Sequence, residues 1–278
     1  MDLNWSQNLV YGLISGLTEI LPVSAQAHRL VLRKVFGGHN IPEITLLLIH
    51  IGILAAVIMS CQNHITKIHR AKALARIPKK RRKRPLDVVS LMDYSLLQTM
   101  VIPVILAFIL LHRVTDYEDN IFLVSALLLL NGIVLYIPQF LPGSNKDSRT
   151  LTRLHGIWIG LASALSALPG ISAMGMALSV GQVCGEDRKY GLNMALLMEC
   201  VVLVILIILD IVTMAQVGMA GTSFSLVMKS VLAGIGAFFT AIGAVRIMGR
   251  LAETNGFTLF AYYCWGAALF MFILTLFA

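Results

Sequence analysis

Three polar side chains near the start of the chain have the chemistry of an acid-base or nucleophilic site. Glu19 lies three residues before Pro22, and Ser24 and His28 follow the proline. If the chain after the proline is helical, the four-residue spacing puts the Ser24 hydroxyl and the His28 imidazole on one face. A carboxylate, a hydroxyl and an imidazole around one break can act on a phosphorus or carbonyl centre. The alternative is that they only satisfy backbone groups that the proline leaves free.

The chain around these residues is too apolar for a soluble protein. Of its 278 residues, 58% are hydrophobic and 13% are charged, and the mean hydropathy is +0.82. A soluble chain has about 45–50% apolar and about 25% charged residues. The excess indicates an integral membrane protein and excludes a disordered chain, a collagen and a disulfide scaffold.

Six apolar runs have roughly the 20 residues that a helix needs to cross a bilayer. They are 44–61, 95–112, 121–141, 192–212, 226–248 and 257–277. Two further apolar stretches, 8–34 and 156–182, are interrupted by Pro22 and Pro169. Because non-helical backbone at membrane depth must face protein or a cavity, these breaks predict re-entrant helical hairpins. The predicted fold class is an all-α integral membrane protein with six transmembrane helices and two re-entrant hairpins.

The net charge of +8 comes from one segment of the chain. Ten of the 22 Lys and Arg residues lie between Lys67 and Arg84, where no Asp or Glu occurs, and the rest of the chain carries −2. Such a segment in a membrane protein is typical of a cytoplasmic loop near anionic lipid, and we predict no nucleic-acid partner. With the basic loop 62–90 in the cytoplasm, most other basic residues also lie inside.

The predicted elements repeat with opposite orientation. A hairpin and three spans in 1–141 are followed by a hairpin and three spans in 156–278, and the two hairpins enter from opposite sides. The sequence Gly-x-x-x-Gly-Leu precedes the proline in both hairpins. That motif is common at close helix contacts. Together with the matched hairpins it predicts one membrane domain, 1–278, built as an inverted repeat, with a ligand site where the broken segments meet near the midplane.

Three more ionisable residues lie inside the predicted spans, where each costs about 2.5–3.5 kcal/mol to insert. For His50 we favour a structural hydrogen bond, and for Asp210 a helix cap near the outer face. Glu199 lies in a continuous apolar run. It is either protonated, paired with a cation or directed into a cavity, and the sequence does not separate these alternatives.

The residues around the two breaks resemble a known family. The sequences GLISGLTEILPVSAQAH at 12–28, IHIGILAA at 49–56 and LPGIS at 168–172 are similar to those of the undecaprenyl-pyrophosphate phosphatase, or bacitracin-resistance, family. The resemblance covers essentially the whole chain. It implies an inverted repeat with two re-entrant hairpins, a location in the bacterial cell membrane, and removal of one phosphate from a C55 isoprenoid diphosphate.

The resemblance implies roles for three residues of the first motif. Ser24 or His28 would attack the terminal phosphorus, and Glu19 would move protons or bind a divalent cation, Mg²⁺ or Ca²⁺. The first glutamate of the family motif is Ser15 here, and residues 25–27 also depart from the family pattern. Because a hard cation prefers several oxygen ligands, the single glutamate predicts a weaker cation site.

The second motif has lost its arginine. By the resemblance, Gly170 and Ser172 bind the phosphate, and the arginine expected after Ser172 is Ala173 here. An arginine directed at phosphoryl charge is worth on the order of 10³–10⁵ in rate in other phosphoryl-transfer enzymes. Its loss predicts a divergent family member with weakened or lost hydrolysis. Arg29, directly after His28, is the nearest basic substitute as a phosphate ligand.

Two functions follow from the sequence. The first is a phosphatase of polyprenyl diphosphates that recycles the lipid carrier of cell-wall precursors. The second is a non-hydrolytic transporter, flippase or binding protein for polyprenyl phosphate, since many secondary transporters have inverted repeats and broken helices. The lost residues favour the second, and a chain with neither activity would be a scaffold. In both cases the partner is a polyprenyl (di)phosphate lipid, and the oligomeric state, a homodimer included, stays open.

Overall fold

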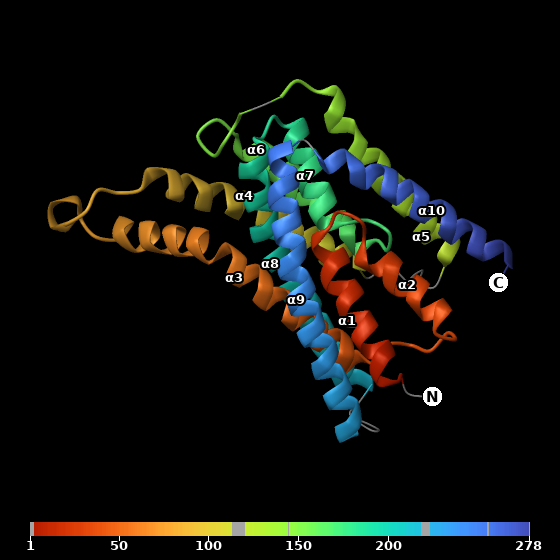
Figure 1. Ribbon diagram of the computed structural model, residues 1–278. Helices are drawn as coiled ribbons and strands as arrows, with labels where there is room; N and C mark the ends of the chain where they lie inside the picture. The colour runs from red at the N-terminus through yellow and green to blue at the C-terminus, as the bar shows by residue number, and fades with distance from the viewer. Residues whose placement is uncertain (1–2, 113–119, 144, 218–222, 255, 278) are drawn as a thin grey trace.

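The computed structural model describes residues 3–112, 120–143, 145–217, 223–254 and 256–277, and most of these are helical (Figure 1). The helices are α1 (Trp5–Ile20), α2 (Ala25–Val35), α3 (Glu43–Ala75), α4 (Val88–His112), α5 (Ile121–Tyr136), α6 (Arg153–Ala164), α7 (Ala173–Val183), α8 (Arg188–Val217), α9 (Phe224–Thr254) and α10 (Leu259–Phe277). Short 3-10 turns lie at Lys79–Arg81, Ile137–Phe140, Leu165–Ala167 and Gly256–Thr258.

Five of the described helices are long and apolar enough to cross a membrane, by length and composition. They are α3, α4, α5 with its following 3-10 turn, α8 and α9. They coincide with five of the six expected spans. The described side chains of α10 form a shorter apolar helix, Leu259–Leu274, so the sixth span stays a prediction. The chain therefore has the helices of an all-α, multi-pass membrane protein.

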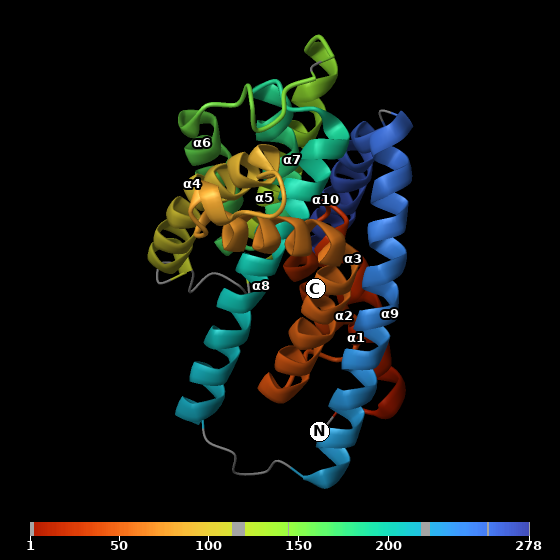
Figure 2. The same ribbon diagram turned by 90° about the vertical axis from the view of Figure 1, so that its left-hand side faces the viewer.

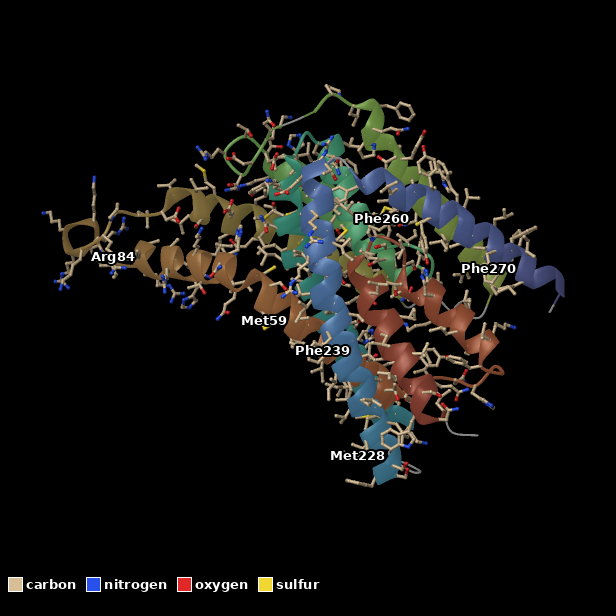
Figure 3. All side chains as sticks on the ribbon, in the orientation of Figure 1. Met59, Arg84, Met228, Phe239, Phe260 and Phe270 are labelled. Carbon is tan, nitrogen blue, oxygen red and sulfur yellow. The ribbon has the colours of Figure 1, made fainter. Side chains whose placement is uncertain are left out.

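The prediction of a loop over 62–90 is wrong for its first half. α3 continues as a helix to Ala75, and α4 begins at Val88. α3 bends near Met59 (Figure 3), where the Ser60 hydroxyl donates to the Ala56 carbonyl and competes with the helical hydrogen bonds. The hydropathy of the sequence shows where the apolar run ends, but not where the helix ends. Lysine, arginine and alanine are good helix formers, so the helix continues beyond that run.

The glycine motifs of the two hairpins make close helix contacts. α1 lies along α9, and α6 lies along α4. A Cβ atom added at Gly12 would lie 2.1 Å from the Ala233 carbonyl oxygen, and one at Gly16 would lie 2.2 Å from the Ala237 carbonyl oxygen. A Cβ atom added at Gly160 of α6 would likewise lie 2.2 Å from the Met100 carbonyl oxygen of α4. Each first helix of a hairpin thus packs backbone to backbone against a long helix from the other half of the chain.

Two apolar clusters hold the helices together. α3 lies between α8 and α9 (Figure 2), and the larger cluster joins these three to α1, α4, α6 and α7. The smaller cluster belongs to α2, α5 and α10, with Val23 from the first break. α1 and α2 therefore pack into different clusters, and the break between them lies where the clusters meet.

A buried pair joins α3 to α8. His50 Nδ1 lies 2.6 Å from Asp210 Oδ2, and both side chains are buried. His50 thus makes the structural hydrogen bond expected of it. Asp210 is not the helix cap that we expected, because α8 continues to Val217. Two spans that are far apart in the sequence are therefore tied together at membrane depth.

Removing one member of this pair should destabilise the fold. We expect His50→Ala to lower the free energy of unfolding by about 3–5 kcal/mol, because it leaves a buried carboxyl group without its partner. The double variant His50→Leu, Asp210→Leu should recover much of that loss. Unfolding in detergent micelles measures it, with the exposed His69→Ala as the control. Equal effects of His50→Ala and His69→Ala would contradict the assignment.

A second buried carboxyl group lies in the turn between α7 and α8. Glu186 is 3% exposed and packs against Gly181 and Gly191. Its Oε1 atom has no hydrogen-bond partner in the described part of the chain. Burial, with a smaller contribution from the Asp187 charge, raises the pKa of Glu186 to about 8. The folded protein therefore keeps a proton on Glu186 at pH 7.

This proton makes stability depend on pH. The unfolded chain releases it near pH 4.3 and the folded chain near pH 8, so Glu186 should make the protein less stable as pH rises through this window. The slope is at most about 1.4 kcal/mol per pH unit. When melting temperature is measured as a function of pH, Glu186→Gln should abolish this loss of stability. The exposed Glu253→Gln should leave it unchanged. A slope that survives in Glu186→Gln would refute this role.

Candidate functional site

The two helix breaks meet at one small cleft. The first break separates α1 from α2, and the second separates the turn after α6 from α7. The cleft is lined by Thr18, Glu19, Ser24, Ala25, Gln26, Phe108, Ser166, Ile171, Ser172, Ala173, Val202 and Leu206. Its volume is about 20 Å³, which is close to the room that one water molecule needs. The structure thus brings together three of the residues singled out from the sequence: Glu19, Ser24 and Ser172.

The first break is fixed by a strained serine. Ser24 has a φ of +62°, and it is the only non-glycine residue with a positive φ in the described part of the chain. Its hydroxyl accepts a hydrogen bond from the Ala27 amide at 3.5 Å and caps α2. Such a backbone persists only where the surrounding structure holds it in place.

The second break depends on a glycine. Gly170 has a φ of +106°, and a Cβ atom there would lie 2.6 Å from the Val124 carbonyl oxygen of α5. Two residues later, the Ser172 hydroxyl accepts from the Gly175 amide at 3.2 Å and caps α7. The backbone of the break therefore lies directly against α5, where a side chain would not fit.

One buried side chain of α5 joins the two breaks. The Asn131 side-chain amide donates to the Pro22 carbonyl at 3.0 Å, and its carbonyl oxygen accepts from the Ser172 amide at 3.0 Å. Asn131 is fully buried. The sequence analysis did not single it out, although a lone asparagine in the middle of an apolar run was a signal that it has a partner at membrane depth.

The same geometry directs two helix N-termini at the cleft. α2 begins at Ala25 and α7 begins at Ala173, and both residues line the cleft beside their capping serines. Each helix has 11 residues. A helix N-terminus presents free N–H groups and the positive end of the helix dipole, which favour an anion such as phosphate.

The cation nearest the first motif is already paired. Arg29 Nη1 donates to Glu19 Oε2 at 3.3 Å, and both side chains are largely buried. Arg29 does not line the cleft. A second buried carboxyl group, that of Glu199 of α8, is 2% exposed and interacts electrostatically with Glu19. Glu199 thus belongs to the surroundings of Glu19, which the sequence left undecided.

His28 lies outside the cleft. Its Nδ1 atom lies 2.8 Å from the Ser24 backbone carbonyl oxygen, and its Nε2 atom lies 2.7 Å from the Tyr263 hydroxyl. The two rings are stacked. The spacing from Ser24 is helical as predicted, but the imidazole meets the serine carbonyl and not the hydroxyl. His28 instead borders an apolar groove of about 220 Å³, lined by Ile14, Ala27, His28, Val31, Leu32, Leu128, Tyr263, Ala267, Phe270 and Met271.

The residues around Glu19 do not form a metal site. Among the described residues, no group of three or more His, Cys, Asp or Glu side chains is placed to hold a metal ion. The Arg29 guanidinium already binds the Glu19 carboxylate, and a hard cation needs several oxygen ligands. This arrangement does not fit Mg²⁺ or Ca²⁺, and the role of Glu19 as a cation ligand stays a prediction from the sequence.

Comparison with known proteins identifies the family. The family described as Bacitracin resistance protein BacA matches residues 8–270. The chain belongs to this family. Its motif-based recognition from the sequence is thereby confirmed.

Curated proteins similar to this BacA-family chain are named undecaprenyl-diphosphatase. One from Nocardioides sp. is 34% identical over 194 residues, which cover 69% of each chain. One from Carboxydothermus hydrogenoformans is 26% identical over 95% of this chain and 94% of its own length. One from Thermosipho melanesiensis is 26% identical over 96% and 98%. The BacA-family similarity therefore spans both helix breaks.

The second break gives a test of the site's construction. We expect Gly170→Ala to lower the free energy of unfolding by at least about 2 kcal/mol, because of the positive φ and the contact with the Val124 carbonyl. Gly143→Ala is the matched control, since a Cβ atom there meets nothing within 4 Å. Chemical denaturation in micelles measures both. Equal stability of the two variants would refute the described backbone at the break.

Proposed function

We propose that this protein binds the phosphate head group of a polyprenyl phosphate or diphosphate carrier lipid at the two helix breaks, and that it hydrolyses the diphosphate weakly or not at all. The convergence of the α2 and α7 N-termini on one cleft carries the proposal. Ser24 and Ser172 add hydroxyl groups there. The cleft must widen to admit a phosphate, because at about 20 Å³ it has room for little more than one water molecule.

The apolar groove beside His28 supports a lipid ligand. It lies among α1, α2, α5 and α10, and apart from His28 and Tyr263 its lining residues are apolar. An isoprenoid chain is a branched hydrocarbon, and burying it against such a surface is favourable. The groove shares α2 with the cleft, so one lipid can place its head group at the N-terminus of α2 and its tail along the same helix.

Three observations support weak hydrolysis. Attack by the Ser24 oxygen on phosphorus would require a base to take the hydroxyl proton, yet both His28 nitrogens contact other oxygens. The Arg29 guanidinium is bound to Glu19 and outside the cleft. Ala173 occupies the position of the arginine in the family motif. The negative charge that develops on the phosphoryl oxygens would therefore be stabilised by backbone dipoles alone, without an arginine guanidinium.

The membrane arrangement that we propose is an inverted repeat with six spans and two re-entrant hairpins. In support, α1 packs on α9 as α6 packs on α4, while α3 pairs with α8 and α5 pairs with α10. The α1–α9 and α6–α4 contacts are equivalent to each other when residues 1–141 and 156–278 are exchanged, and the α3–α8 and α5–α10 contacts join corresponding elements. With the basic segment in the cytoplasm of a bacterial cell, the C-terminal end of α9, which carries Arg246 and Arg250, also faces inward.

A non-hydrolytic transporter is the second candidate function. The two halves of the chain make equivalent helix contacts with each other. Such pseudo-symmetry favours a transporter, because it lets one site open to either side of a membrane. Labelled polyprenyl phosphate should then change leaflet in proteoliposomes faster than in protein-free vesicles. Equal rates would exclude transport and leave the binding proposal intact.

Phosphate release from farnesyl diphosphate tests the hydrolysis proposal. We expect the protein and its Ser24→Ala variant to release phosphate at rates within about twofold of each other. Ala173→Arg should raise the rate at least tenfold, because an arginine fork at this position can follow the phosphoryl charge. The matched control is Val183→Arg, which places the charge on an exposed position at the far end of α7.

Two results would contradict this account. Efficient release that Ser24→Ala abolishes would make the protein an ordinary phosphatase. No gain with Ala173→Arg would show that the arginine is not the missing element. Farnesyl phosphate binding, measured on the same preparations, separates a failure of hydrolysis from a failure of binding.

A further inference from the structure

The basic arm, formed by residues 62–90 of α3, α4 and the turn between them, has no part in the proposed function. It leaves the bundle sideways and runs across the direction of α9 (Figures 1 and 2). Arg84 lies at its tip, far from the other labelled side chains (Figure 3). The apolar run 44–61 ends where α3 bends near Met59. The helix thus changes direction where its apolar segment ends, and the end of an apolar segment of spanning length is expected at the membrane surface.

The arm carries a dense positive charge. Eight of its cations are exposed: Lys67, Arg70, Arg76, Lys79, Lys80, Arg81, Lys83 and Arg84. No acidic residue occurs between Lys67 and Leu86. Within the described part of the chain, none of the eight has a carboxylate oxygen within 4 Å. In the described part of the chain, most of this positive charge therefore has no ion-pair partner.

The arm is nevertheless a built structure. Arg82 closes the tip by donating from Nε to the Ile77 carbonyl at 2.7 Å and from Nη2 to the Ala75 carbonyl at 3.1 Å. The Ala75 carbonyl is at the C-terminal end of α3 and the Ile77 carbonyl lies just beyond it, and a cation is favourable there. Nearer the bundle, Lys72 of α3 donates to the Tyr94 hydroxyl of α4. The two helices are therefore held side by side, and the exposed cations have defined positions.

Large apolar side chains are exposed next to these cations. Ile77 lies between them, and Val88, Val89 and Met92 follow the last of them in the first turns of α4. The four side chains are between 37% and 52% exposed. An element with apolar side chains beside a cluster of Lys and Arg residues is typical of a segment that lies in the lipid interface. Nucleic acid offers phosphates to the cations but no apolar phase for these side chains.

We propose that the basic arm lies on an anionic membrane surface, with its cations on lipid phosphates and the four apolar side chains in the acyl boundary. Each Lys or Arg near an anionic leaflet strengthens such a contact about fivefold. The contact holds the cytoplasmic end of α4, and α4 packs against α6 of the second hairpin. Anionic lipid is thereby connected to the element that carries the second helix break.

Amide hydrogen exchange of residues 76–90 in nanodiscs tests this proposal. We expect exchange at least fivefold slower in phosphatidylcholine with about 30% phosphatidylglycerol than in phosphatidylcholine alone. About 0.5 M NaCl should reverse the difference, because it screens the charges. Lys79→Gln, Lys80→Gln, Lys83→Gln should lose the protection. The matched control with three exposed cations removed elsewhere, Arg149→Gln, Arg153→Gln, Arg250→Gln, should keep it.

Other outcomes would overturn the proposal. Equal exchange in the two lipids would mean that the arm does not contact the anionic surface. Protection in both lipids that resists salt would indicate a protein contact, such as a second copy of the chain. Equal loss in the arm variant and the control would assign the effect to overall charge. Protection by an RNA oligonucleotide in the neutral lipid, without protection by the anionic lipid, would make nucleic acid the partner.

Discussion

The arrangement of the whole site depends on one buried asparagine. Asn131 donates to the carbonyl of Pro22 at the first helix break and accepts from the amide of Ser172 at the second. Both breaks expose backbone groups that lipid cannot satisfy, and each such group is costly at membrane depth. One amide satisfies a group from each break, so the two broken segments are stable only when they lie together against α5.

This constraint sets what the site can bind. Because Asn131 holds the breaks together, the N-termini of α2 and α7 face the same cleft. Each N-terminus is equivalent to roughly half a positive charge, so together they attract a phosphate about as strongly as one cation. They lack the planar guanidinium group with which an arginine can bind two phosphoryl oxygens at once as the phosphoryl group is transferred. Together with the pairing of Arg29 with Glu19, this supports our proposal that the site binds an anion and cleaves it weakly or not at all.

The sequence predicts those features that local composition decides. Prolines at 22 and 169 predicted the breaks, and the hydropathy runs predicted five helices that are long and apolar enough to cross a membrane. The pairing of His50 with Asp210 and of His28 with Tyr263 was not predictable, because each joins residues more than 150 positions apart. Asn131 was a visible polar residue in an apolar run, but its partners Pro22 and Ser172, 109 and 41 positions away, could not be read from the sequence. The helical arm was missed because hydropathy reports the lipid boundary and not where a charged helix ends.

Equilibrium binding of farnesyl phosphate to an Asn131→Ala variant in nanodiscs is the most direct test of the claim that two joined helix breaks form the phosphate site. The account predicts binding at least tenfold weaker than for the unaltered protein, with the helical circular dichroism retained. The exposed Asn193→Ala serves as the control and should bind normally. An Asn131→Ala variant that is folded and binds farnesyl phosphate with unchanged affinity would contradict the account.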